Sequence, residues 1–391
     1  MMANRVPLWS VTTWDKKYNA VEKEWQPQTI KYKYLLSDEL DGICVDGGDV
    51  RLLYTGKDSG YTTEDLAGDA LAEGEIVAIP WGGTPSVKYF KGKFVTGDNR
   101  IATSSKPNEL LNKYLYYFLL GNLKEISTYY RGAGLKHPAM RDILNMKISY
   151  PDMEKQAQII AQFDLLQEII DKRKRQMVEL DNLIKARFVE LFGTLENPVQ
   201  KFKRATLKEL CTKITDGKHG GCTQEEGTER YFVGAREIYD NIVHYDTAPE
   251  INLAEFEKDY KRCNVEIGDF LIVNTGATIG KSAIATDPRT ECTLLQKSVA
   301  LLKVKRELLN PVFLQYCYKV NEKMYKVESA SAQPNLLLSK INSTEIYVPP
   351  IELQEQFSAF VKQTDKSKVV VQKALDEAQT LFDSLMQEYF R

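Results

Sequence analysis

The sequence predicts an α/β (α+β) fold in which two globular domains are separated by two long helices that form an antiparallel coiled coil. Three observations lead to this prediction. The 391-residue chain repeats itself, because residues 151–159 (PDMEKQAQI) resemble residues 349–357 (PPIELQEQF) after a separation of 198 residues. Each of these segments starts a long amphipathic helix. The regions before them contain short β-rich runs followed by turn residues, which is typical of mixed α/β domains.

The two helices carry apolar stripes with a seven-residue period. Positions step by 3 and 4 through four heptads, in the same phase in both helices. Neither helix buries its stripe alone, so we expect the helices to pack on each other. The alternative is that each docks on its own globular domain. The expected contact positions are Phe163, Leu166, Ile170, Met177, Leu180, Ile184 and Leu191 in the first helix, and Val361, Val371, Leu375, Phe382 and Leu385 in the second, with Arg187 and Lys368 as polar members.

The repeat divides the chain into four segments. Gly193 should end the first helix, since glycine is the usual residue just beyond a helix C-terminus. Strands are expected at 75–80 (EIVAIP) and 269–274 (DFLIVN), and helices near 112–120 and 310–318. The predicted segments are a first globular domain (1–150), a central helical region (151–197), a second globular domain (198–348) and a C-terminal helical region (349–391).

Composition excludes several classes of protein. The chain contains no run of 18 apolar residues, which argues against a transmembrane helix, and its N-terminus has no apolar signal region. We therefore expect a cytosolic protein. Six cysteines include no CxxC pair and there are only three histidines, which disfavours disulfides and structural zinc. The formal net charge of −2 does not by itself announce nucleic-acid binding, which would require a local basic surface.

Glycine-rich turns are candidate binding loops. Residues 276–282 (GATIGKS) have one residue too few between their glycines for a phosphate-binding loop of nucleotide enzymes. Two alternatives remain open: a tight turn between strands, or a turn that brings Thr278 and Lys281 to a nucleic-acid backbone. The counterpart in the first repeat is 82–88 (GGTPSVK), with Thr84 and Lys88.

Two further loops carry polar side chains suited to DNA. In the run DGKHGG (216–221), Lys218 and His219 have the groups to reach a phosphate or a base edge, although a solvated turn explains them equally well. Near the end of each repeat, Lys136 and His137 suit phosphate or guanine, whereas Gln333 and Asn335 suit adenine. Local capping of turns is the alternative.

Motifs of catalysis do not occur in the sequence. It has no DPPY or NPPF tetrapeptide, no FxGxG loop, and no HxH or HxxxH pair. We accordingly expect no catalytic residue, no metal and no cofactor.

This layout resembles the specificity (S) subunit of type I restriction–modification enzymes. The resemblance covers the whole chain and is carried by PDMEKQAQIIAQF, VPPIELQEQFSAF, TGATIGK and QPNLLLSKINSTEIYVPP, supported by DGKHGG and VPLWSV. The first repeat departs from it, with Pro85 and Ser86 in the turn and LKHPAM in place of AQPNLL. This departure leaves open which loops of the first domain touch DNA.

The resemblance implies a non-catalytic subunit that binds double-stranded DNA. The globular domains 1–150 and 198–348 would be target-recognition domains 1 and 2, each reading one half of a bipartite asymmetric site, and the two helical regions would be spacers that set the distance between the halves. Two modification (methyltransferase) subunits and the restriction (endonuclease/translocase) subunits are the implied partners, with no membrane association. The candidate DNA contacts are Thr84, Lys88, Arg100, Lys136, His137, Lys218, His219, Thr278, Lys281, Gln333 and Asn335.

Three alternatives remain at this point. The chain could be the S subunit of a related system whose partner fuses nuclease and methyltransferase. It could instead be an enzyme with a cleft between its repeats, or a coiled-coil adaptor that does not touch DNA.

Overall fold

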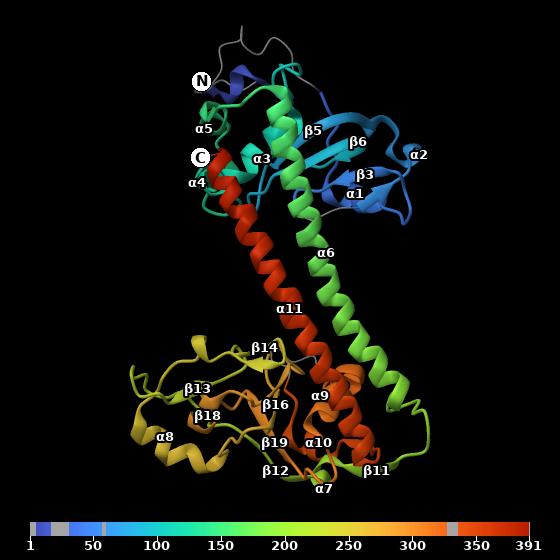
Figure 1. The fold of residues 1–391 in the computed structure, drawn as a ribbon, viewed down its shortest axis with the longest axis vertical. Coiled ribbons are helices and arrows are strands. Elements are labelled where there is room, and N and C mark those ends of the chain that lie inside the picture. Colours follow the sequence, from blue (N-terminus) through green and yellow to red (C-terminus); the bar gives the residue numbers. More distant parts are fainter. Residues whose placement is uncertain (1–4, 17–30, 57–59, 327–334, 391) are drawn as a thin grey trace. The chain divides into compact units, whose positions relative to one another are not determined.

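A computed structural model describes residues 5–16, 31–56, 60–326 and 335–390 (Figure 1). The chain forms two compact units, one made of residues 1–174 and 373–391 and the other of residues 175–372. Each unit contains one globular head and a part of each long helix. We name the first head by its strands β1–β10 and the second by its strands β11–β20.

The first head is built on a six-stranded sheet of order β2-β7-β5-β6-β3-β4. All neighbours are antiparallel except β3 and β6. A short pair, β1 with β10, brings the two ends of the head together. The strands are β1 (Val6–Pro7), β2 (Thr12–Trp14), β3 (Val50–Leu53), β4 (Gly60–Thr62), β5 (Ala72–Pro80), β6 (Lys88–Thr96), β7 (Asn99–Ser104), β8 (Tyr130–Arg131), β9 (His137–Pro138) and β10 (Lys147–Ile148), and the helices are α1 (Ser37–Gly42), α2 (Glu64–Ala67), α3 (Asn112–Gly121), α4 (Leu123–Thr128) and α5 (Met140–Asn145).

The second head repeats the centre of this topology. Its four-stranded sheet has the order β12-β19-β16-β17, which corresponds to β2-β7-β5-β6, and its end pair β11–β20 corresponds to β1–β10. The strands are β11 (Lys203–Thr206), β12 (Cys211–Asp216), β13 (Tyr231–Val233), β14 (Ile238–Tyr239), β15 (Ile242–Val243), β16 (Phe270–Val273), β17 (Ser282–Ile284), β18 (Thr293–Leu295), β19 (Val299–Val304) and β20 (Glu345–Val348), and the helices are α7 (Leu207–Leu210), α8 (Leu253–Asp259), α9 (Pro311–Val320) and α10 (Leu338–Ser343). The predicted strands and helices at these places are therefore confirmed.

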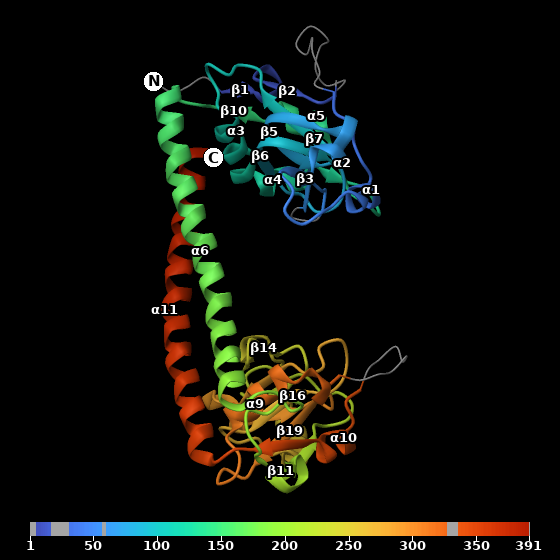
Figure 2. The same ribbon diagram turned by 90° about the vertical axis from the view of Figure 1, so that its right-hand side faces the viewer.

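The two long helices are α6 (Met153–Phe192) and α11 (Ile351–Phe390). Within each unit their segments lie side by side and antiparallel (Figure 2). In the first unit the Phe163 ring lies 5.3 Å from Phe382, and in the second the Phe188 ring lies 5.3 Å from Phe357. α6 ends where predicted, because Gly193 adopts φ +74° in the left-handed region. The predicted fold class, with its antiparallel coiled coil, is confirmed.

The contact stripe departs from strict heptads near the helix C-termini. The heptad predicts Arg187 and Leu191 on the seam, but the fully buried residues there are Phe188 and Phe192. The stripe shifts because a straight α-helix has about 3.6 rather than 3.5 residues per turn. The head also covers this end of α6, as Phe313 of α9 packs 4.9 Å from the Phe192 ring. Arg187 instead pairs with Glu190 on its own helix at 2.8 Å.

The repeated glutamines attach each helix N-terminus to its head. Gln156 is fully buried and its Nε2 donates to the carbonyls of Glu109 (2.7 Å) and Pro151 (2.8 Å), while its Oε1 accepts from the Leu111 N–H (3.0 Å). Gln354 makes the same three bonds in the second unit, to Leu308 O, Pro349 O and Asn310 N–H. A buried amide is tolerated only when its donors and acceptor are paired, which explains why both repeats keep a glutamine here.

Candidate nucleic-acid interface

Four segments of the first head enclose a cavity of about 620 Å³. They are the residues after β3, the turn between β5 and β6, the residues just before β7, and the loop that enters β9. The lining residues are Thr55, Gly56, Trp81, Gly82, Gly83, Thr84, Ser86, Val87, Lys88, Asp98, Leu135 and His137. Thr84 is exposed and Leu135 is 64% exposed, so the cavity opens on the surface. Three of the predicted contacts, Thr84, Lys88 and His137, meet in this one place.

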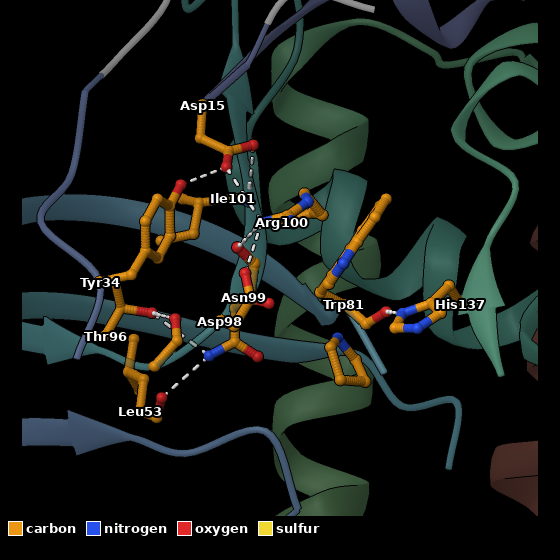
Figure 3. Close-up of polar contacts among 12 residues, drawn as sticks. Asp15, Tyr34, Leu53, Trp81, Thr96, Asp98, Asn99, Arg100, Ile101 and His137 are labelled. Atoms are coloured by element: carbon orange, nitrogen blue, oxygen red, sulfur yellow. Dashed lines mark hydrogen bonds and ion pairs between the residues drawn. The ribbon is translucent and has the colours of Figure 1, made fainter. Parts of the chain in front are cut away.

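Trp81 and His137 lie next to each other in the lining of this cavity (Figure 3). The His137 Nδ1–H donates to the Trp81 carbonyl at 2.7 Å, and the two rings lie 5.4 Å apart. Main-chain bonds hold the loops together: Trp81 N–H donates to Asp98 O (2.9 Å) and Gly83 N–H donates to Lys136 O (3.2 Å). A Cβ at Gly82 would lie 3.0 Å from the Leu135 side chain, so glycine permits this close approach.

Arg100 lies beneath the cavity rather than in it, which corrects our expectation of a DNA contact. The residue is 2% exposed, and its guanidinium stacks 3.9 Å from the Trp81 ring (Figure 3). It pairs with Asp98 at 3.0 Å and with the buried Asp15 at 3.8 Å. Tyr34 donates to the same Asp15 carboxylate. Burial raises the pKa of Asp15, and the bond from Tyr34 and the charge of Arg100 oppose this shift. Arg100 therefore positions Trp81 and is unavailable to a ligand.

The other two predicted residues of the first head, Lys136 and Lys88, differ in how accessible their side chains are to a ligand. Lys136 is exposed, and its carbonyl belongs to the loop contact with Gly83. The Lys88 ammonium donates to the carbonyls of Tyr54 and Thr55, which keeps it at the cavity wall. The Lys136 side chain is thus accessible at the surface, whereas the Lys88 ammonium is committed to the main chain.

The second head brings the equivalent loops around a cavity of about 390 Å³. Its lining comes from the loop after β12, the start of the β16–β17 turn, the residues before β19, and Asn335. These residues are Lys218, Gly220, Thr275, Gln296, Lys297, Ser298 and Asn335. Thr275 forms a β-bridge with Asn335, and its hydroxyl donates to Asn335 Oδ1 at 3.3 Å. Asn335 stands 198 residues after His137, so the two heads place different side chains at one position.

In the loop after β12, only one of the two predicted DNA contacts, Lys218 and His219, has an accessible side chain. The Lys218 ammonium bonds Asp259 (2.6 Å) and Glu255 (3.4 Å) of α8 and is 19% exposed. The hydrogen bond with Asp259 raises the pKa of Lys218. His219 is exposed, with its Nε2 3.8 Å from Asp216. Only His219 of this pair has a freely accessible side chain.

The β16–β17 turn holds Thr278 and Lys281, with Lys281 exposed. Both glycines of the turn need the left-handed region, Gly276 at φ +97° and Gly280 at φ +91°. A Cβ at Gly280 would lie 2.4 Å from the Tyr325 ring. The turn is therefore tight and presents Lys281 to solvent, which is compatible with both interpretations of this motif. Gln333 lies outside the described residues.

Sequence reasoning missed several residues that line the cavities. They are Trp81, Asp98 and Leu135 in the first head and Thr275, Gln296, Lys297 and Ser298 in the second. The repeat offset was the available signal, because Gln296 stands 198 residues after Asp98. Residues that precede the equivalent strands β7 and β19 in the two repeats would have been found by this test.

The described parts of the chain contain neither a metal-binding cluster nor a membrane-spanning helix. Within residues 5–16, 31–56, 60–326 and 335–390, no group of three or more His, Cys, Asp or Glu side chains is arranged to hold a metal ion. Across the same ranges, the helices include none with the length and apolarity needed to cross a membrane.

Comparisons with known proteins identify the family. Residues 46–180 and 200–378 match the sequence model of the "Type I restriction modification DNA specificity domain". The chain is similar to the S subunit of a type I restriction-modification system from M. genitalium, with 17% identity, a TM-score of 0.59, and coverage of 99% of this chain and 96% of that one. It is also similar to a chain from work on complex assembly and conformational transition of the type I R-M system (16% identity, TM-score 0.52, coverage 90% and 96%). At these identities the solved structures show a shared fold. The family match covers most of the sequence in two copies, so the chain belongs to the family of type I restriction modification DNA specificity domains and serves as a specificity subunit.

Proposed function

We propose that each head reads one half of a bipartite asymmetric DNA site through the loops around its cavity. The observation that carries this proposal is that both heads bring the same loops together on the same strand order, but with different side chains. His137 in the first head is matched by Asn335 in the second, and Asp98 by Gln296. A constant frame with variable polar side chains suits two readers of different sequences.

We propose further that the chain is the non-catalytic part of its complex and acts in the cytoplasm. Two modification subunits would supply methyl transfer, and restriction subunits would supply cleavage. The exposed apolar side chains of the long helices support a docking role: Val178 and Leu183 of α6 and Val369 and Val370 of α11 are each at least half exposed. The family match supports the type I assignment, and no finding supports a fused partner or an adaptor without DNA contact.

A head exchange tests independent reading. The second head, between the end of α6 and the start of α11, would be replaced by the corresponding segment of another family member, and the methylated sites of a host expressing the hybrid complex would be sequenced. We expect one half of the target to change while the other half and the gap stay the same. A change in both halves would refute independent reading by the heads.

An insertion tests whether the helices determine the gap between the half-sites. Four residues added to each helix, after Lys174 and after Gln372, lengthen the pair by about 6 Å and nearly preserve the phase of the stripe. Because B-DNA rises about 3.4 Å per base pair, the preferred gap should lengthen by one or two base pairs. An unchanged gap at full activity would mean that the helices bind partners without setting the distance.

A further inference from the structure

The first head fixes the hydrogen-bonding character of His137. A backbone carbonyl has no proton to give, so the 2.7 Å contact with Trp81 O requires the proton on Nδ1. In the neutral ring the other nitrogen, Nε2, is then an acceptor. The two ring nitrogens point in different directions, and Nε2 has no hydrogen-bond partner among the described residues. The ring belongs to the cavity lining, so this acceptor is offered to a ligand there.

The surroundings hold the ring in this orientation. His137 belongs to β9, whose register with β8 pairs it with Arg131. The Trp81 ring lies beside it, and the Arg100 guanidinium stacks on that Trp81 ring (Figure 3). Such support is what a group needs if it is to discriminate between ligands, because a mobile acceptor would adapt to any of them.

The other charged groups of the cavity point to a ligand that donates hydrogen bonds. Asp98 presents a half-exposed carboxylate, which is an acceptor. Among the residues that the structure describes, the lining contains one ammonium, that of Lys88, and it is directed to two backbone carbonyls. A phosphate offers only acceptors, as do the major-groove edges of guanine and thymine apart from the thymine methyl. Adenine N6 and cytosine N4 are the base amines that donate in the major groove.

We propose that His137 is a specificity-determining residue of the first head that accepts a hydrogen bond through Nε2 from the exocyclic amine of adenine or cytosine. This inference rests on the proposed function, since it assumes that the cavity faces DNA. It revises the expectation from sequence that His137 would suit phosphate or guanine. Lys136, which is exposed beside it, keeps the role of a sequence-independent phosphate contact.

The test uses the full-length chain assembled with its modification subunits and a library of random DNA duplexes. The informative variant is His137→Asn, which introduces the residue that the second head carries at this position. Its amide nitrogen can still donate to Trp81 O, and its remaining acceptor, Oδ1, belongs to a shorter side chain that does not reach the position of Nε2. Sequencing of bound duplexes should show a wild-type requirement for adenine or cytosine at one position, and a loss of about 10- to 100-fold in discrimination there in the variant. All other positions should be unchanged.

A base analogue separates the amine from other effects. Removing the amine at that position, with purine in place of adenine or 2-pyrimidinone in place of cytosine, should weaken wild-type binding about tenfold or more and leave His137→Asn nearly unaffected. The analogue that weakens binding identifies the base. His137→Ala gives the same readout should the Asn variant fold poorly, and Lys136→Ala should weaken binding to all sequences evenly.

The same experiment tests separately whether the heads read DNA sequence and whether His137 takes part in that reading. If the wild-type complex selects no sequence, the proposed function fails. If it selects a split site and His137→Asn retains every preference, the role of His137 is refuted and the proposed function stands. A variant that changes a guanine or thymine position would show that His137 donates rather than accepts, which also refutes the inference.

Discussion

Replacing Gln156 by Glu should destabilise the first unit in a pH-dependent way. Glutamate has nearly the same shape, and one oxygen can still accept from the Leu111 N–H. The other oxygen takes the place of Nε2, which lies 2.7 Å from Glu109 O and 2.8 Å from Pro151 O. Two donated bonds are thereby replaced by contacts between oxygens in a fully buried site. An ionised carboxylate held in this way costs about 3–5 kcal/mol.

Protonation relieves a part of this cost, because a protonated carboxyl can donate to one of the two carbonyls. The site therefore raises the pKa of the new side chain above the value of about 4.3 in the unfolded chain. A group whose folded pKa is raised binds more protons in the folded state, so its contribution to stability is present at low pH and is lost as pH rises through the folded pKa. The variant should approach the wild type near pH 4–5 and differ most at pH 8.

Calorimetric melting of the wild type, Gln156→Glu and Gln158→Glu at pH 5 and pH 8 measures this effect. Gln158 is the matched control, since it lies on the same turn of α6 and is exposed. A unit of this size loses roughly 2–4 °C per kcal/mol, so the melting temperature should fall on the order of 10 °C at pH 8 in the buried variant alone. Equal melting of the two variants at pH 8 would show that the three bonds of Gln156 do not support the fold. Gln354→Glu, with Gln356→Glu as its control, repeats the test in the second unit.

Three further predictions concern the second unit. Burial is the main cause that lowers the pKa of Lys319 to about 8. Because the unfolded chain then binds more protons between pH 8 and 10.5, the free energy of unfolding of the wild type should rise over this range. Lys319→Met should remove that rise and add up to ~3 kcal/mol to the free energy of unfolding at pH 7, measured by denaturant unfolding. Gly280→Ala places a Cβ 2.4 Å from the Tyr325 ring at φ +91° and should cost at least ~2 kcal/mol, and a melt like that of the wild type would contradict the turn geometry. Phe188→Ala should lower the free energy of unfolding by about 3–5 kcal/mol in the same assay, whereas Val178→Ala, at an exposed position, should lower it by a few tenths. Similar losses in both variants would mean that α6 does not bury the face that carries Phe188.

Periodic and repeated features were readable without a structure. Spacing of apolar residues predicts α6 and α11, because a helix places every third and fourth residue on one face. The repeat offset predicts that the two heads share a topology, and Gly193 marks the end of α6. Bulky residues that replaced the expected heptad positions, such as Phe188, were missed because the head covers that end of the helix, which no local pattern records. The boundaries of the four predicted segments remain a prediction.

Local sequence determined which loops carry polar side chains, whereas tertiary structure decided which of those side chains are available. Arg100 and His137 are equally plausible DNA contacts in the sequence. Packing places Arg100 under Trp81 between two carboxylates, while it places His137 at the cavity, where no described residue bonds its Nε2. Lys218 is likewise paired with Asp259, a residue 41 positions away along the chain. Burial and pairing depend on residues distant in sequence, so motifs alone determined the kind of chemistry present in each loop, and only the folded chain decided which groups can use it.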